Sequence, residues 1–318
     1  MNMYLEIKGI RPDGYHEIET LYRGINLHDT LILRKRKGGI RLDCGGIGLR
    51  GLPERFNLAW RAADLLSRAY PGKIKGAGMR LIKRIPASAG LGGGSADAAA
   101  ALIGLDRLYS LDLDTDALQS LAAQLGADVP FCLDPLAAVG RGKGEALEPL
   151  EAAESEFPLW IVLLKPPFGL PTREVYGKWR PRAAAAGGER LGLLRRGMRE
   201  KDAGLVRENM INDLEAPAFA LKGELVEYRG LIEEEMEKLT IRRSRDKPGA
   251  AEGKVLLSGS GSAFAAYFTE EGLARELAEG LKANRRLPGE SMIILTKTLT
   301  GEDLAQRVTG ESRADQLS

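Results

Sequence analysis

The segment Pro86–Ala100, PASAGLGGGSADAAA, places four glycines between an expected strand, Met79–Ile85, and an expected Ala-rich helix, Ser95–Leu108. Glycine lets a backbone approach a ligand closely and adopt positive φ angles. The N-terminus of a helix presents backbone N–H groups without helical partners and the positive end of the helix dipole. The order of strand, glycine loop and helix therefore predicts an anion site, most simply for phosphate.

Two common phosphate-binding sequences do not fit this segment. A P-loop carries Lys directly after its last glycine, whereas Ser95 follows Gly94 here. The dinucleotide fingerprint Gly-x-Gly-x-x-Gly begins well at Gly90-Leu91-Gly92, but Ser95 stands where the third glycine belongs. A turn without a ligand is the alternative, although glycines in mid-loop cost conformational entropy that a plain turn does not need.

The composition argues against several other classes. Lys+Arg 46 against Asp+Glu 44 leave a net charge of +2, which gives no reason to expect a nucleic acid or an anionic membrane as partner. Two cysteines and two histidines, in no cluster, argue against a disulfide framework or a His-rich metal site. The longest apolar run, Phe157–Leu164, is too short for a membrane span, and the N-terminus lacks a signal-peptide pattern. We expect a cytoplasmic protein.

The length of 318 residues, at about 100–200 residues per domain, predicts two domains. The acidic stretch Glu148–Glu156 is the expected linker, which divides the chain into residues 1–150 and 151–318. The sequence does not predict an oligomeric state.

Hydrophobic periodicity and turn residues predict further elements. The expected strands are Met3–Ile7, Ile18–Ile25, Thr30–Leu33, Leu159–Leu164 and Ile293–Leu295. Helices are expected over Asn57–Tyr70 and from Asp114 or Thr115 to Leu125, and Asn212–Leu239 is expected to be largely helical. The basic run Arg34–Lys37 is interpreted as a solvated strand end at a hairpin, and Val255–Phe268 as a strand, a loop and a second strand or helix. Arg242–Lys254 is expected to be a mobile loop, and residues 311–318 to be frayed.

Several segments together carry a family resemblance. Pro86–Ala96 resembles the phosphate-binding motif of the GHMP kinases, which is close to Pro-x-x-x-Gly-Leu-Gly-x-x-x-Ala. Segments similar to one branch of this family are Arg11–Ile18, Gly126–Phe131, Pro171–Tyr176, Asn212–Glu215 and Leu257–Ser262. The matches run in family order from residue 2 to about residue 270, so they cover most of the chain.

The resemblance implies an α+β, two-domain GHMP kinase fold with an active-site cleft between the domains. It implies that ATP, with Mg²⁺, phosphorylates the 2-hydroxyl of a small cytidyl substrate, a diphosphocytidyl alcohol of the non-mevalonate route to isoprenoid precursors. Two alternatives stay open. One is another small-molecule kinase of the same family, and the other is a catalytically weakened nucleotide-binding relative.

The resemblance also assigns roles to residues of this chain. Asp128 matches the catalytic aspartate of the family, which accepts the alcohol proton. The assignment depends on the matching residues around it, because Asp128 alone would be interpreted as an ordinary loop residue. Ser95 is a candidate Mg²⁺ ligand. The ATP-binding residues are Pro86, Gly90, Leu91, Gly92, Gly93, Gly94, Ser95 and Ala96, and the substrate-binding residues are Asn2, Tyr15, His16, Tyr176, Gly259 and Gly261.

Three of these neighbourhoods have an equally simple structural interpretation. Lys143 could bind a diphosphate, but an exposed lysine in a hairpin explains it equally well. Asn57 lies near the nucleotide in the family, but capping of the following helix would explain it as well. His16 could be a turn residue packed after Gly14.

One position departs from the family pattern. The first motif of the family reads roughly Pro-Ala-Lys-x-Asn, and its Lys works beside the catalytic aspartate. Asn2 matches the Asn, so the Lys would fall one residue before Met1, and Lys8 is no substitute. We favour a true start upstream of Met1, because the other motifs are intact, over a weakened relative. Loss of such a Lys would cost on the order of 3 kcal/mol of transition-state stabilisation.

Overall fold

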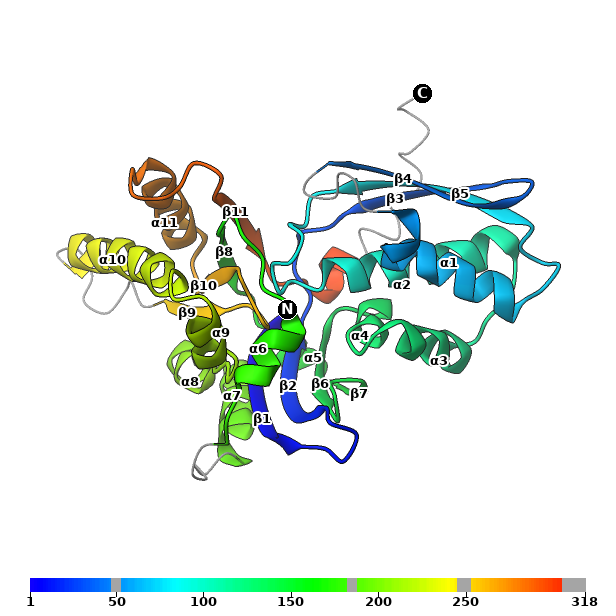
Figure 1. The fold of residues 1–318 in the computed structure, drawn as a ribbon. Coiled ribbons are helices and arrows are strands. Elements are labelled where there is room, and N and C mark those ends of the chain that lie inside the picture. The colour runs from blue at the N-terminus through cyan, green and yellow to red at the C-terminus, as the bar shows by residue number, and fades with distance from the viewer. Residues whose placement is uncertain (47–52, 182–187, 245–252, 305–318) are drawn as a thin grey trace.

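A computed structural model of the protein describes residues 1–46, 53–181, 188–244 and 253–304. It consists of three β-sheets and the helices that pack on them (Figure 1), so the fold is α+β as predicted. Among the described residues, no helix is both long and apolar enough to cross a membrane.

The first sheet is antiparallel, and its strands come from the beginning and the end of residues 1–150. Its strand order is β1 (Asn2–Ile10), β2 (His16–Arg23), β6 (Ala137–Arg141) and β7 (Ala146–Pro149). The turn between β1 and β2 is closed by the Arg11 N–H, which donates to the Tyr15 carbonyl at 2.7 Å, and Gly14 takes a φ of +82° there. β1 is longer than the expected strand because its pairing with β2 continues to Ile10 and His16.

The second sheet has the order β3 (Thr30–Lys35), β5 (Gly76–Lys83) and β4 (Gly39–Gly46). The predicted hairpin at Arg34–Lys37 is therefore wrong, although the run does lie at a strand end. β3 and β4 pair with opposite edges of β5, and the chain crosses the end of β5 between them. Glycines permit that crossing, since a Cβ at Gly76 would lie 2.6 Å from the Gly39 carbonyl oxygen.

Helices cover one face of this sheet (Figure 1). They are α1 (Leu58–Ala69), α2 (Gly93–Tyr109), α3 (Thr115–Leu125) and α4 (Val129–Leu133), and a 3₁₀ turn, η1 (Glu54–Phe56), precedes α1. The Asn57 side chain accepts from the Ala59 N–H at 2.9 Å, which confirms Asn57 as the cap of α1. α2 begins two residues earlier than expected, because Gly92 in the left-handed region is its cap and accepts from the Ala96 N–H.

The third sheet lies in the C-terminal half and is antiparallel. Its order is β11 (Met292–Lys297), β8 (Trp160–Lys165), β10 (Phe264–Phe268) and β9 (Lys254–Leu257). Alternate residues of β8 enter two different cores: Val162 and Leu164 lie in one, and Ile161 and Leu163 in the other. Burial on both faces explains why this strand is a continuous apolar run in the sequence.

The remaining helices surround the third sheet. They are α5 (Ala152–Ser155), α6 (Thr172–Lys178), α7 (Gly188–Glu200), α8 (Ala203–Asn209), α9 (Glu215–Leu221), α10 (Leu225–Ser244) and α11 (Glu271–Ala283). The expectation that Asn212–Leu239 is largely helical is confirmed by α9 and α10. Asn212 itself bridges to β1 at Leu5, and extended backbone at Lys222 separates α9 from α10. Val255–Phe268 forms strand, loop and strand, one of the two expected patterns.

Three expectations are only partly addressed by the described residues. The expected loop Arg242–Lys254 begins within α10 and ends at β9, while 245–252 lie outside the described residues, as do 311–318. The domain division near residue 150 stays a prediction. One core joins Met3 and Leu21 from the first sheet to Ile161 and Leu163 from the third, so the two halves share apolar contacts.

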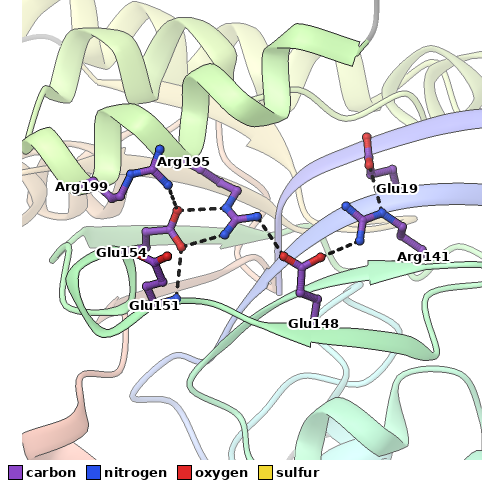
Figure 2. Close-up of polar contacts among 7 residues, drawn as sticks. All are labelled: Glu19, Arg141, Glu148, Glu151, Glu154, Arg195 and Arg199. Carbon is purple, nitrogen blue, oxygen red and sulfur yellow. Dashed lines mark hydrogen bonds and ion pairs between the residues drawn. The ribbon is translucent and has the colours of Figure 1, made fainter.

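A chain of ion pairs also joins the first sheet to α7 (Figure 2). Arg195 donates to both oxygens of the Glu154 carboxylate, at 2.9 and 3.1 Å, and Arg199 donates to the same carboxylate at 2.7 Å. Arg195 also pairs with Glu148 on β7, which in turn pairs with Arg141 on β6 at 2.7 Å. The Glu154 side chain has no exposed surface, so the two guanidinium groups compensate a fully buried charge.

Candidate active site

The glycine loop lies between β5 and α2 and is folded against a second glycine loop. Gly90 and Gly92 have φ angles of +72° and +67°, in the left-handed region that favours glycine. A Cβ at Gly90 would lie 1.9 Å from the carbonyl oxygen of Ser258, and one at Gly259 would lie 3.0 Å from the Gly90 carbonyl oxygen. The loops therefore approach each other backbone to backbone.

The first turn of α2 faces the space beside these loops. The first intrahelical bond of α2 is donated by Ala96, so the N–H groups of Gly93, Gly94 and Ser95 precede the helical ladder. They lie at the positive end of a 17-residue helix. This geometry suits a bound anion, in agreement with the prediction from the sequence.

A cavity of about 720 Å³ opens in front of the glycine loop. Eleven of the predicted site residues line it: Asn2, Pro86, Gly90, Leu91, Gly92, Gly93, Gly94, Ser95, Asp128, Tyr176 and, from the second loop, Gly259. Lys143 and Asn57, whose roles the sequence left open, line the same cavity. The structure thus brings the N-terminal strand, the glycine loop and the Asp128 turn to one space.

Four predicted residues lie outside the wall of this cavity. Ala96 lies on α2 and lines a smaller neighbouring cavity of about 360 Å³. A Cβ at Gly261 would face the side chains of Leu257 and Leu170 rather than the cavity. Tyr15 and His16 lie at the turn between β1 and β2, where Tyr15 is 60% exposed.

Aromatic rings nevertheless connect that turn to the cavity. The His16 ring lies 5.0 Å from the Tyr176 ring and 5.5 Å from the Trp179 ring, measured between centroids. Burial lowers the pKa of His16, which favours its neutral imidazole. The Lys143 Nζ lies 4.8 Å from the centre of the Tyr15 ring, which places a cation and an aromatic face at the mouth of the cavity.

Asp128 is a carboxylate that lines the cavity from the residue immediately before α4. It lines both cavities, and its Oδ1 accepts a hydrogen bond from the Tyr22 hydroxyl at 3.1 Å. Burial, and then the charge of Asp128, raise the pKa of Tyr22 well above its ordinary value. Tyr22 was not singled out from the sequence, where it is one of several apolar residues in an expected strand.

A buried charge cluster beneath the glycine loop was also missed. The Lys83 Nζ lies 2.7 Å from Asp97 Oδ2 and pairs with Asp29 as well, and all three side chains are about 95% buried. Asp29 accepts in addition from the Ile85 N–H at 2.9 Å. Burial outweighs the attraction of Lys83 and raises the pKa of Asp97 to about 7. The cluster links the end of β5 to the first turns of α2.

The segment Asn212–Glu215 supports the second glycine loop. The Asn212 side-chain amide donates to the carbonyls of Leu257 and Gly259, both at 2.8 Å, and Glu215 accepts from the Leu257 N–H at 2.8 Å. The hydroxyls of Thr172 and Ser260 lie 2.9 Å apart at the edge of the cavity. The segment Asn212–Glu215 therefore supports the site from behind the second glycine loop. Of its four residues, Leu214 alone lines the cavity.

Comparisons with known proteins agree with this architecture. Residues 57–134 match the family described as "GHMP kinases N terminal domain". The chain is 49% identical over 182 residues, 57% of its length and 61% of the relative's, to the 4-diphosphocytidyl-2-C-methyl-D-erythritol kinase of Pelotomaculum thermopropionicum. It is 34% identical to the kinase of the same name from Acetivibrio thermocellus over 89% of its own length and 92% of the relative's.

A solved structure extends the likeness to three dimensions. It is the crystal structure of a 4-(cytidine 5'-diphospho)-2C-methyl-D-erythritol kinase, which is 34% identical and superposes with a TM-score of 0.71. The match covers 94% of this chain and 97% of the other. The chain therefore belongs to the 4-diphosphocytidyl-2-C-methyl-D-erythritol kinases, a branch of the GHMP kinase family.

Proposed function

We propose that this protein transfers the γ-phosphoryl group of ATP to the 2-hydroxyl of 4-diphosphocytidyl-2-C-methyl-D-erythritol. The observation that carries the proposal is the shared cavity, in which the glycine loop, the N-terminus of α2 and Asp128 face one another. Relatives that match over most of both chains and carry this kinase name support the choice of substrate. Phosphoryl transfer needs positioning and charge compensation more than covalent chemistry, and this cavity offers both.

Each part of the cavity takes a role in the transfer. The backbone N–H groups of Gly93, Gly94 and Ser95 hold phosphate oxygens of ATP at the positive end of α2. The substrate oxygen forms a bond to the γ-phosphorus while the bond from that phosphorus to the departing oxygen of ADP breaks. The proton of the substrate hydroxyl passes to the Asp128 carboxylate.

Mg²⁺ would be held at the same end of the cavity. Ser95 supplies a hydroxyl there, beside the phosphate oxygens. Within the described part of the chain, no group of three or more His, Cys, Asp or Glu side chains is placed to hold a metal ion. A single hydroxyl such as that of Ser95 fits an ion that is held chiefly by phosphate and water, as Mg²⁺ often is. When bound, the ion neutralises phosphate charge.

The substrate-binding assignments concern the opposite end of the cavity. Tyr176 and Tyr15 provide aromatic faces for the cytosine, and the neutral His16 imidazole provides a donor or acceptor for its edge. Lys143 provides a cation for the diphosphate. Asn2 and Gly259 lie beside Gly90 rather than at that end, where they contribute the strand and loop that border the acceptor alcohol, and Gly261 belongs to the same loop.

Asp128→Asn tests the catalytic assignment. The change keeps the size of the side chain and removes its capacity to accept the alcohol proton. We expect kcat to fall by about 100-fold or more while ATP still binds, as measured by ADP release and by titration with a fluorescent ATP analogue. Retention of at least half of the wild-type kcat would rule out Asp128 as the proton acceptor.

A further inference from the structure

Tyr22 contacts the catalytic carboxylate although it belongs to a distant strand. It lies on β2, is 4% exposed, and lines both cavities. Its hydroxyl donates to Asp128 Oδ1 at 3.1 Å across a separation of 106 residues. With one carboxylate oxygen engaged by the phenol, the other oxygen is available to a substrate hydroxyl.

Two neighbouring elements pack against the Tyr22 ring. The ring stacks on Phe131 of α4, with centroids 4.9 Å apart and planes inclined by 24°. The ring also contacts bare backbone of the β6–β7 hairpin. A Cβ at Gly140 would be 2.6 Å from the Tyr22 ring, and one at Gly144 would be 2.3 Å from its hydroxyl oxygen. A side chain at either glycine would displace the phenol from Asp128.

The same hairpin reaches the substrate end of the cavity. Between Gly140 and Gly144 it carries Lys143, which lines the cavity and lies over the Tyr15 ring. The Gly142 carbonyl accepts from the Ile18 N–H at 2.8 Å, which fixes the hairpin to β2. Tyr22 thus lies in a continuous row of contacts from the hairpin to Asp128.

The phenol is a hydrogen-bond donor at neutral pH. Burial and the Asp128 charge raise the pKa of Tyr22, so its proton is retained throughout the physiological range. A neutral donor restricts the rotation of a carboxylate without neutralising it. Loss of that restriction affects the reacting geometry more than the affinity for either substrate.

From these contacts we infer that Tyr22 is a positioning residue, which holds the Asp128 carboxylate so that Oδ2 faces the acceptor hydroxyl. The inference rests on the proposed function and adds a residue to the reaction. It assigns to the phenolic hydroxyl an effect on turnover rather than on substrate binding. The glycines at 140 and 144 are, on this account, requirements of the Tyr22 position.

Tyr22→Phe in the full chain tests the inference, because it removes one oxygen and keeps the ring that packs on Phe131. We expect kcat to fall by about tenfold, with the KM values for ATP and for the cytidyl substrate each within about twofold of wild type. Tyr109→Phe is the matched control. It also removes a hydroxyl that donates to a partner, the Gly76 carbonyl, but Tyr109 lies at the far end of α2 and lines neither cavity.

Thermal unfolding of both variants separates positioning from stability. If Tyr22 only stabilises the fold, the fall in kcat should be in the same proportion to the loss of melting temperature in both variants. A kcat for Tyr22→Phe within twofold of wild type, or a rise in KM without a fall in kcat, would overturn the inference. Failure of both the wild-type chain and a form extended by Ala-Lys before Met1 to release ADP with the cytidyl substrate would instead overturn the proposed function.

Discussion

The hydroxyl of Ser258 donates to the carbonyl of Gly90 at 2.9 Å and so ties together two glycine loops that are 168 residues apart. The contact is possible because Gly90 carries no side chain on the face that Ser258 approaches. It fixes the proposed phosphate loop from the C-terminal half of the chain. Changes in either loop are therefore expected to affect ATP binding.

Gly90→Ala tests this contact. The new Cβ would lie 1.9 Å from the Ser258 carbonyl oxygen and the residue would have to keep a φ of +72°. We expect the KM for ATP to rise by at least about tenfold. Gly72→Ala is the matched control: its φ is +81° but no atom lies within 4 Å of the new Cβ. It should cost about 1–2 kcal/mol of stability and leave the KM for ATP unchanged. Equal KM values in both variants would contradict the role of the contact.

Asn212→Ala is expected to loosen the second glycine loop. The change leaves the carbonyls of Leu257 and Gly259 without their side-chain donor in a buried setting. We expect a loss of about 2–3 kcal/mol in the free energy of unfolding, measured in urea. Asn209→Ala removes a single amide bond to Leu205 within one helix and should cost about 1 kcal/mol. A smaller loss for Asn212 than for Asn209 would count against the support described here.

Arg195→Met tests the ion-pair chain in Figure 2. It removes the bidentate partner of Glu154, whose side chain has no exposed surface. We expect a loss of about 3 kcal/mol in the free energy of unfolding. Arg275→Met breaks an exposed pair with Glu271 one helical turn away, where about 0.5 kcal/mol or less is expected. Comparable losses in the two variants would show that these ion pairs contribute no more to the free energy of unfolding than an exposed surface pair does.

The buried Asp97 predicts a pH dependence of stability with a definite sign. Burial raises the pKa of Asp97 to about 7 in the folded protein, above the 3.8 of an unperturbed aspartate. The folded state then binds more protons than the unfolded state between about pH 4 and pH 7, so this group makes stability fall as the pH rises through that range. The slope from one group is at most about 1.4 kcal/mol per pH unit.

Asp97→Asn measures that contribution. The difference in unfolding free energy between wild type and variant should decline from about pH 4 to about pH 7 and then level off. Urea unfolding at half-unit pH intervals gives the curve. A difference that is constant with pH, or that grows as the pH rises, would show that Asp97 is ionised in the folded protein at low pH.

Local features of the site could be predicted from the sequence. The glycines around Gly90, the cap at Asn57 and the alternation in β1 follow from short-range conformational rules. Family resemblance then assigned Asp128, whose own neighbourhood gives no chemical signal. The first turn of α2 was misplaced by two residues, because Gly92 serves as a cap without a side chain.

Contacts between distant segments could not be predicted in the same way. The pairing of β3 and β4 with opposite edges of β5 depends on a strand that comes later in the chain. The Tyr22–Asp128 hydrogen bond and the cluster of Lys83 with its two carboxylates join residues whose local patterns are those of ordinary strands and helices. Burial of a charge is decided by such tertiary contacts, and composition does not reveal it.

An added Ala-Lys before Met1 tests the position at which the family pattern places its lysine. The Met1 amino group is buried and donates to the Arg23 carbonyl at 2.8 Å. Burial lowers the pKa of that amino group, and the charge of Asp128 is among those that oppose the shift. A lysine joined there would lie near Asp128, so we expect kcat to rise by on the order of 100-fold. An unchanged kcat would mean that this chain does not use such a lysine.

The most direct test of the central claim is ADP release from Mg²⁺-ATP with and without 4-diphosphocytidyl-2-C-methyl-D-erythritol. The 318-residue chain and the Ala-Lys form are assayed in parallel, and homoserine and mevalonate serve as comparison acceptors. The account predicts release that depends on the cytidyl substrate in at least one form and stays at background with the other acceptors. Folded samples of both forms that bind ATP but release no ADP with the cytidyl substrate would contradict it.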